Sequence, residues 1–118
     1  MNRTGPSNTH TQTLIAALVQ AGVQAPIWKR VAFELARSTR QRREVNLSRI
    51  NRYTEQNETI IVPGKVLGSG VLEHPVTIAA FSFSASAKTA IEHAKGKTIT
   101  IAELVKAKPK GQGVRIIG

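Results

Sequence analysis

The spacing of apolar residues predicts two helices near the N-terminus. Between residues 10 and 21, apolar side chains recur every three or four positions, which is the period of an amphipathic helix. Pro26 suits the first turn of a second helix, because the first backbone amides of a helix have no partner within it. Across residues 27–37 the apolar side chains fall on one half of that helix, and the charged ones fall on the other with Phe33. We therefore predict an N-terminal helical hairpin whose apolar stripes face each other.

Short runs of β-branched and apolar residues predict strands in the rest of the chain. The runs cover residues 45–47, 59–62, 65–67, 76–81, 97–100 and 114–117. Pro63-Gly64 separates the second run from the third, which predicts a turn between two strands. The run at 76–81 is apolar at consecutive positions, so we expect this strand to be covered on both faces.

Three shorter helices are predicted between these strands by their capping residues. Ser48 is a suitable N-cap for one or two helical turns, and Ser84 or Ser86 can begin a longer helix. Residues 100–103 read Thr-Ile-Ala-Glu, which is the Thr-x-x-Glu form of a capping box and predicts the start of the last helix. Helices and strands therefore alternate, and the predicted fold class is α/β.

The chain is expected to form one domain behind a short arm. Residues 1–9 are polar and contain Gly5-Pro6, which predicts a flexible N-terminal arm ahead of a single domain at residues 10–118. A chain of 118 residues, 41% of them hydrophobic, supports one modest core. No apolar run is long enough to cross a membrane, and the first residues lack the apolar segment of a signal peptide. We therefore expect an intracellular protein without a membrane partner.

Positive charge is concentrated in one fifth of the chain. Seventeen Lys and Arg residues face seven acids, all of them Glu, for a formal net charge of +10. Residues 29–52 contain eight cations and two acids, a net charge of +6. These cations are Lys29, Arg30, Arg37, Arg40, Arg42, Arg43, Arg49 and Arg52. Because arginine pairs with phosphate through two parallel hydrogen bonds and stacks on bases, we favour nucleic-acid binding over a merely solvated face. Residues 38–44 are expected to form an exposed basic loop.

A second basic segment lies near the C-terminus. Residues 106–113 contain three lysines, among them Lys108 and Lys110, and end in Gly-Gln-Gly. Glycines let backbone amides approach a phosphate where a side chain would obstruct, so we favour contact with nucleic acid here too. The alternative is an ordinary turn between a helix and a strand with solvated lysines.

Three aromatic residues are candidates for stacking on unpaired bases. Phe33 lies between cations on the polar half of the second helix, where it either stacks on a base or packs against another element. Trp28 borders the apolar stripe and is expected in the core or at its rim. Tyr53 stands beside Arg49 and Arg52, and the sequence favours neither role for it.

Catalytic and metal-binding patterns are missing from the sequence. It contains no Cys and no Asp, and the histidines His10, His74 and His93 lack the spacing of metal ligands. Gly64-Lys65 is followed by Val-Leu rather than by the Ser or Thr of a nucleotide-binding loop. We therefore expect no enzyme activity, no cofactor, no metal and no small-molecule substrate.

Four motifs carry a resemblance to a known family. They are Asn46–Ile50, Val62–Gly68, Phe83–Ala87 and Pro109–Arg115, in this order along the chain. Together they resemble large-subunit ribosomal protein eighteen of archaea and eukaryotes, which is related to the universal large-subunit protein fifteen. The resemblance spans nearly the whole chain, and its compact length is similar to that of the archaeal members.

The resemblance implies a fold, a role and a set of contacts. The fold is an N-terminal helical part followed by an irregular β-β-α superhelix-like core with short strands. The role is that of a structural constituent of the large subunit in the cytoplasm, which binds and stabilises folded large-subunit rRNA beside neighbouring ribosomal proteins. The RNA contacts so implied are Arg37, Arg40, Arg42, Arg43, Arg49 and Arg52, with Lys65, Lys110 and Arg115 as further candidates. A free-standing nucleic-acid regulator or RNA chaperone is the alternative that the residues leave open.

Overall fold

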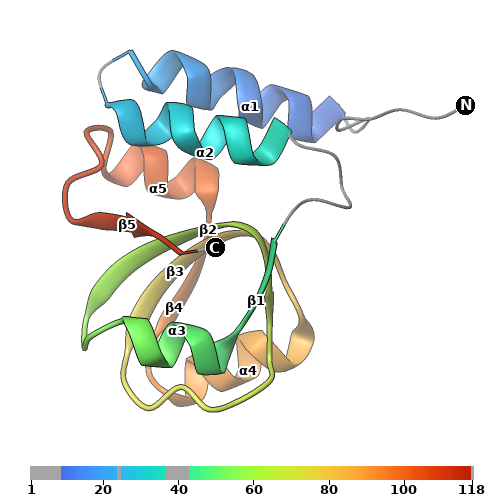
Figure 1. The fold of residues 1–118 in the computed structure, drawn as a ribbon, viewed down its shortest axis with the longest axis vertical. Coiled ribbons are helices and arrows are strands. Elements are labelled where there is room, and N and C mark those ends of the chain that lie inside the picture. Colours follow the sequence, from blue (N-terminus) through green and yellow to red (C-terminus); the bar gives the residue numbers. More distant parts are fainter. Residues whose placement is uncertain (1–8, 24, 37–42, 118) are drawn as a thin grey trace, which may run out of the picture.

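The computed structural model describes residues 9–23, 25–36 and 43–117. Five helices and five strands follow one another in these residues (Figure 1). They are α1 (Thr9–Ala21), α2 (Pro26–Ala36), β1 (Arg43–Asn46), α3 (Leu47–Tyr53), β2 (Glu58–Leu67), β3 (Val76–Phe83), α4 (Ala85–His93), β4 (Lys97–Thr100), α5 (Ile101–Ala107) and β5 (Val114–Ile116). The α/β class predicted from the sequence is confirmed. The predicted arm at residues 1–9 falls almost entirely outside the described residues, although α1 includes Thr9.

The strands form one sheet in which every pairing is parallel. β3 runs along one edge of β2, and β4 pairs with the far edge of β3. The other edge of β2 is shared end to end by two strands. β5 pairs with Thr59–Ile61, and β1 pairs with Gly64–Leu67. The last strand of the chain and the first strand are therefore neighbours along one side of the sheet.

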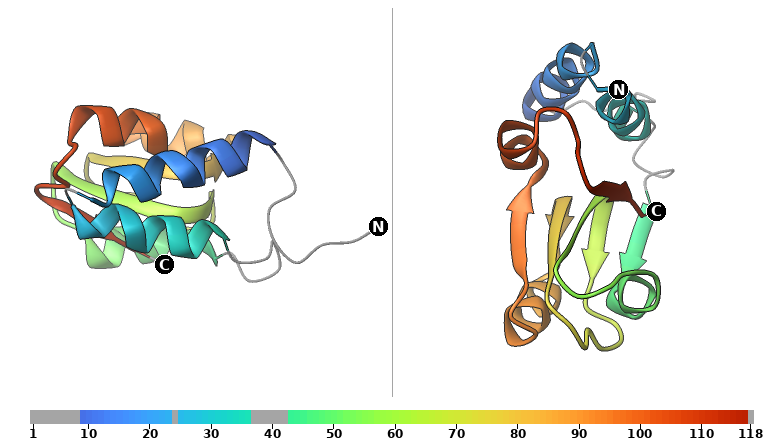
Figure 2. Two further views of the ribbon diagram at one scale, coloured as in Figure 1. Left: turned by 90° about the horizontal axis from the view of Figure 1, so that it is seen from above. Right: turned by 90° about the vertical axis from the view of Figure 1, so that its left-hand side faces the viewer.

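Helices cover both faces of the sheet. α1, α2 and α5 lie on one face, and α3 and α4 lie on the other (Figure 2). Buried side chains form a separate hydrophobic core on each face. Along β3, Ile78 and Ala80 belong to the core beneath α3 and α4, whereas Ala79 belongs to the core beneath the other helices. The predicted covering of this strand on both faces is confirmed, as expected for a parallel sheet.

The predicted apolar stripe of α2 is also confirmed. Val31 and Leu35 are fully buried in the core beneath α1, α2 and α5, and α1 packs beside α2. Trp28 is fully buried as well, and its Nε1 donates a hydrogen bond of 2.7 Å to the Pro109 carbonyl. This bond satisfies the one polar atom of a large apolar side chain. Trp28 is therefore a core residue, in agreement with the sequence-based expectation.

The predicted turn at Pro63-Gly64 is wrong. Both residues lie inside the ten-residue strand β2, so the two predicted strands around them are a single strand. The pairing with β3 shifts its register between Val62 and Lys65. Such a bulge leaves one residue outside the hydrogen-bonded ladder, and proline, which has no amide hydrogen, is tolerated there. The dipeptide thus bends a strand instead of reversing the chain.

Two boundaries around β1 also differ from the prediction. Arg43 and Glu44 belong to β1 rather than to an exposed loop, because they pair in parallel with Gly64 and Lys65. The N-cap of α3 is Asn46 rather than Ser48. Both errors have one cause. Parallel pairing with a strand about twenty residues later begins β1 two residues before the predicted start and ends it at Asn46, one residue before the predicted end, and nothing in the local sequence signals that pairing.

The capping residues predicted for the last two helices are confirmed. Ser84 is the N-cap of α4, and its side chain accepts a hydrogen bond from the Ala87 amide. Thr100 and Glu103 form the predicted capping box at the start of α5, with hydrogen bonds of 3.1 Å and 2.7 Å. These caps involve residues three positions apart, which is why the sequence reveals them.

Candidate nucleic-acid interface

Most of the predicted RNA-binding residues that the structure describes are carried by elements on one side of the sheet. α2, α3, β1 and β5 lie toward this side, whereas α4, α5 and β4 lie toward the opposite side (Figure 2, right). We call the first side the basic edge and define it by the cations of α2, α3 and β5. These cations are Lys29, Arg30, Arg49, Arg52 and Arg115, and all of them are exposed. The fold thus brings a residue near the end of the chain to the cations of residues 29–52.

Helix α3 presents two arginines and an aromatic ring. Leu47 and Ile50 are buried beneath the helix, which leaves Arg49 and Arg52 on its exposed side. The Arg49 guanidinium lies over the Tyr53 ring, with Cζ at 5.1 Å from the ring centroid. Tyr53 itself is 49% exposed. Arg52 stands in the last turn, where the partial negative charge of the helix end favours a cation.

Helix α2 adds the second group of cations. Lys29 and Arg30 are exposed, and Arg30 Nε lies 3.5 Å from a Glu34 carboxylate oxygen. The Arg30 side chain is 67% exposed and the Glu34 side chain 13%, so the guanidinium of this pair still faces solvent, where it can meet a phosphate. Phe33 lies on the same exposed half and is 61% exposed. It does not pack into either described core.

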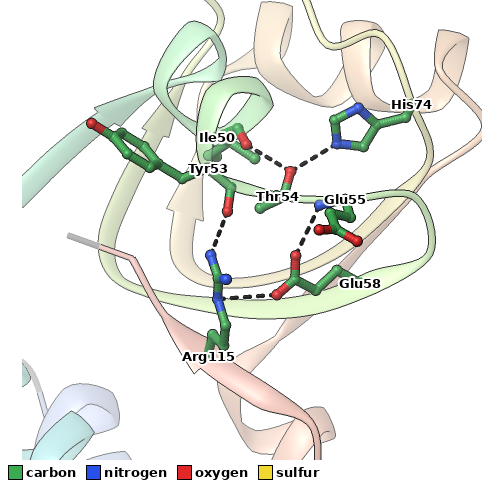
Figure 3. A network of polar contacts seen from close by, with 7 residues as sticks. All are labelled: Ile50, Tyr53, Thr54, Glu55, Glu58, His74 and Arg115. Atoms are coloured by element: carbon green, nitrogen blue, oxygen red, sulfur yellow. Dashed lines mark hydrogen bonds and ion pairs between the residues drawn. The ribbon is translucent and has the colours of Figure 1, made fainter.

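Arg115 is held by two partners of its own chain. Its Nε forms an ion pair of 3.0 Å with Glu58, and its Nη2 donates a hydrogen bond to the Tyr53 carbonyl (Figure 3). The side chain is still 53% exposed. A guanidinium has five N–H donors, so donors remain for a further acceptor. Arg115 therefore ties β5 to the end of α3 while facing solvent.

A second set of contacts stabilises the same helix end. Thr54, directly after α3, is buried, and its Oγ1 donates a hydrogen bond of 2.6 Å to the Ile50 carbonyl. His74 Nε2 lies 2.8 Å from the same hydroxyl oxygen. Because the hydroxyl has one hydrogen and gives it to Ile50, the histidine Nε2 is the donor in this second bond. No sequence motif pointed to Thr54, Glu58 or His74 as a group, because the bond between Thr54 and His74 and the ion pair of Glu58 with Arg115 join residues that are distant in sequence.

The C-terminal basic segment packs against the start of α2. The Pro109 carbonyl accepts the Trp28 hydrogen bond, and Gly111 adopts a φ of +67°. A Cβ at Gly111 would lie 2.5 Å from Ile27 Cγ2, so this position requires glycine both for its backbone angle and for its close approach. The turn is therefore firmly positioned. It leaves Lys110 exposed and Lys108 half-buried beside α2.

The structure describes only some of the remaining predicted RNA-binding residues. Lys65 is exposed on β2, where it pairs in register with Glu44 of β1. The backbone of Arg43 begins β1. Arg37, Arg40 and Arg42 lie outside the described residues.

The described part of the chain offers neither a cluster of metal ligands nor a membrane-spanning helix. It holds no group of three or more His, Cys, Asp or Glu side chains that could hold a metal ion. None of its helices is long and apolar enough to cross a membrane.

Comparisons with known proteins agree with the resemblance seen in the sequence. The model of the family described as ribosomal protein 60S L18 and 50S L18e matches residues 14–118. Several relatives are named large ribosomal subunit protein eL18. The one from Methanoregula boonei is 56% identical over 94 residues, which cover 80% of this chain and 78% of the relative. The one from Methanococcus maripaludis is 46% identical over 119 residues, covering 99% of each chain.

A third relative of the same name, from Archaeoglobus fulgidus, is 47% identical over 113 residues, which cover 94% of this chain and 97% of the relative. The family consists of structural ribosomal proteins, which agrees with the expectation that the chain is not an enzyme. The family match covers the four motifs on which the resemblance was based. The chain therefore belongs to the family of ribosomal protein 60S L18 and 50S L18e.

Proposed function

We propose that the chain is a structural constituent of the large ribosomal subunit in the cytoplasm, where it stabilises folded large-subunit rRNA through its basic edge. Its relatives are named large ribosomal subunit proteins. The observation that carries the RNA-binding part is the exposure of Arg49 and Arg52 on α3, beside Arg115 of β5. Neighbouring large-subunit proteins are the further partners that this location implies.

The basic edge binds RNA by neutralising phosphates that the RNA fold brings close together. Each phosphate contact releases condensed counterions, so the logarithm of the affinity falls linearly with the logarithm of the salt concentration. About six such contacts give a slope of roughly −4 to −5. Recognition is mainly of RNA shape, because the deep groove of an RNA helix hides the base edges from side chains.

The proposed contacts include residues beyond the described cations of the basic edge. Lys65 and Lys110 are exposed and Lys108 is half-buried. Arg37, Arg40, Arg42 and Arg43 join the proposal on the strength of their position in the chain, between α2 and β1. Arg115 contributes to RNA binding through the guanidinium N–H groups that are not bonded to Glu58 or to the Tyr53 carbonyl.

Binding of the full chain to transcribed large-subunit rRNA, measured across a salt series, tests this proposal. Replacing Arg49 and Arg52 together by Ala should weaken binding and make the salt slope shallower by about 1.5. The matched control replaces Lys88 of α4 and Lys97 of β4 together by Ala. This variant loses the same amount of charge, but from elements on the opposite side of the sheet. We expect this control to leave the slope nearly unchanged.

Two outcomes would contradict the proposal. If both double variants weaken binding equally, the protein attracts RNA by net charge alone and the basic edge has no special role. If the chain binds short unrelated RNA or DNA as tightly as it binds large-subunit rRNA, it acts as a free-standing regulator or chaperone. Co-sedimentation with large subunits at moderate salt, with release only at high salt, is the result expected in cell extract.

A further inference from the structure

The end of α3 presents an exposed aromatic ring, and hydrogen bonds from other parts of the chain hold the backbone beside it. Tyr53 is the last residue of the helix and is 49% exposed. Its carbonyl accepts a hydrogen bond from Arg115, and the next residue, Thr54, is buried and bonded to both Ile50 and His74. The chain directly after the ring is thus held by Arg115 and His74, which are distant in sequence.

The loop that follows is held by the same network. One carboxylate oxygen of Glu58 forms the ion pair with Arg115. The other accepts a hydrogen bond of 2.9 Å from the Glu55 amide. Figure 3 shows that the Tyr53 ring projects away from this network while its backbone takes part in it. In the part of the chain that the structure describes, the Tyr53 side chain forms no hydrogen bond, and its one assigned contact is with Arg49. The ring is therefore positioned without being enclosed.

Arg49 gives the ring a cationic backing. Its guanidinium lies over the ring at 5.1 Å, which is within the range of a cation–π interaction. Arg52, the residue before Tyr53, is exposed on the same helix, and Arg115 of β5 contacts the Tyr53 carbonyl rather than the ring. A planar, electron-rich ring that is half exposed and backed by a cation suits a nucleobase, because the base stacks on the ring while the adjoining phosphates pair with nearby guanidinium groups.

We propose that Tyr53, backed by Arg49, is a stacking site for one unpaired base of the large-subunit rRNA. The proposal rests on the RNA-binding function above and adds a non-ionic contact to it. The positive charge of Arg49 over the ring, with the exposed Arg52 next in sequence, favours a nucleotide over an apolar side chain of a neighbouring protein. A nucleotide also brings phosphate oxygens for the Arg115 donors that Glu58 and the Tyr53 carbonyl do not use.

The test exploits the fact that stacking and charge pairing affect salt dependence differently. Tyr53→Leu in the full chain keeps an apolar side chain but removes the flat ring. We expect affinity for transcribed large-subunit rRNA to fall by about 5- to 100-fold, with an unchanged salt slope because no charge is lost. Tyr53→Phe keeps the ring and should bind within about twofold of the parent. Arg52→Ala serves as the contrast, since it should make the slope shallower by about 0.7 to 0.9.

A second readout identifies the contact directly. The chain contains a single Tyr, so ultraviolet cross-linking of the protein–rRNA complex followed by mass spectrometry should give an RNA adduct on the peptide that contains Tyr53. Circular dichroism melting of Tyr53→Leu shows whether the variant is folded. If it is not, the comparison of the parent with Tyr53→Phe and the cross-link decide the question.

The outcomes separate this proposal from the function on which it rests. If Arg52→Ala changes the slope but folded Tyr53→Leu binds like the parent, RNA binding stands and the stacking site is refuted. If Tyr53→Leu binds naked rRNA normally but enters subunits poorly, the ring packs against a neighbouring protein, and the assignment to a base is wrong. If the parent chain does not prefer large-subunit rRNA at all, the proposed function itself fails.

Discussion

Helices α3 and α4 cover the same face of the sheet, but their ends are stabilised from different sources (Figure 2). The capping hydrogen bonds at both ends of α4 come from residues of its own segment, although the amide of the N-cap Ser84 also bonds the Val66 carbonyl of β2. At the start, Ser84 Oγ accepts a hydrogen bond of 3.1 Å from the Ala87 amide. At the end, the amides of residues 94–96 bond back to the carbonyls of residues 90–92. α4 is thus a helix whose limits its own sequence encodes.

Both ends of α3 depend on distant residues instead. The Ser48 amide, in the first turn, donates a hydrogen bond of 3.1 Å to the Ser69 carbonyl. At the other end, His74 and Arg115 bind Thr54 and the Tyr53 carbonyl across separations of 20 and 62 positions. A helix of seven residues is too short to be stable alone, so these contacts are needed to hold it.

This difference matters because the proposed RNA contacts lie on α3. Arg49, Arg52 and Tyr53 are oriented only when β2, β5 and the 68–75 segment are in place. An RNA that binds them therefore recognises the assembled fold rather than a local peptide. Loss of a distant contact should consequently affect α3 and leave α4 intact.

The largest expected effect comes from the buried hydroxyl at the end of α3. Thr54→Val removes the bonds to Ile50 and His74 at a position that is 7% exposed, and we expect a loss of about 1–3 kcal/mol in the free energy of unfolding. The matched control is Thr89→Val in α4. Thr89 Oγ1 makes the same bond four residues back, to Ala85, but on the surface. Urea unfolding should show a change within about 0.5 kcal/mol for the control. Equal losses of stability for the two variants would contradict the view that α3, unlike α4, depends on contacts with distant residues.

The N-caps allow a second, smaller comparison. Ser84→Ala removes a cap hydrogen bond from α4 and should cost about 1 kcal/mol. Asn46 is the N-cap of α3, but its side chain makes no cap hydrogen bond with the described residues. Asn46→Ala should therefore cost less than about 0.5 kcal/mol. Urea unfolding of both variants measures the difference, and a larger loss at Asn46 would show that α3 is capped by its own sequence after all.

The smallest effect is expected for the ion pair that ties β5 to α3. A double-mutant cycle with Arg115→Gln and Glu58→Gln should give a coupling energy of about 0.5–1 kcal/mol, because Arg115 is 53% exposed and the pair is screened by solvent. The coupling should shrink at high salt. A coupling that persists at high salt would mean that the pair acts as a buried one.

Sequence reasoning succeeded wherever a feature depends on neighbours a few residues apart. The stripe of α2, the caps at Ser84 and Thr100 and the two-sided burial of β3 all follow from local spacing. It failed at Pro63-Gly64 and at the start of β1, because strand pairing overrode a local turn signal and a local polar run. The candidate site divides in the same way. The cations could be named from the chain, but the supports of Tyr53 could not.

The amino-acid sequence by itself determined the α/β class, the positive charge and the family, because periodicity, composition and motifs are properties of the chain. Only the tertiary structure decided that β1 and β5 share one edge of β2 and that Arg115 reaches the end of α3. The physical reason is that parallel strands pair across long sequence separations. Which strands become neighbours depends on how the two hydrophobic cores pack, and no short stretch of sequence encodes that packing.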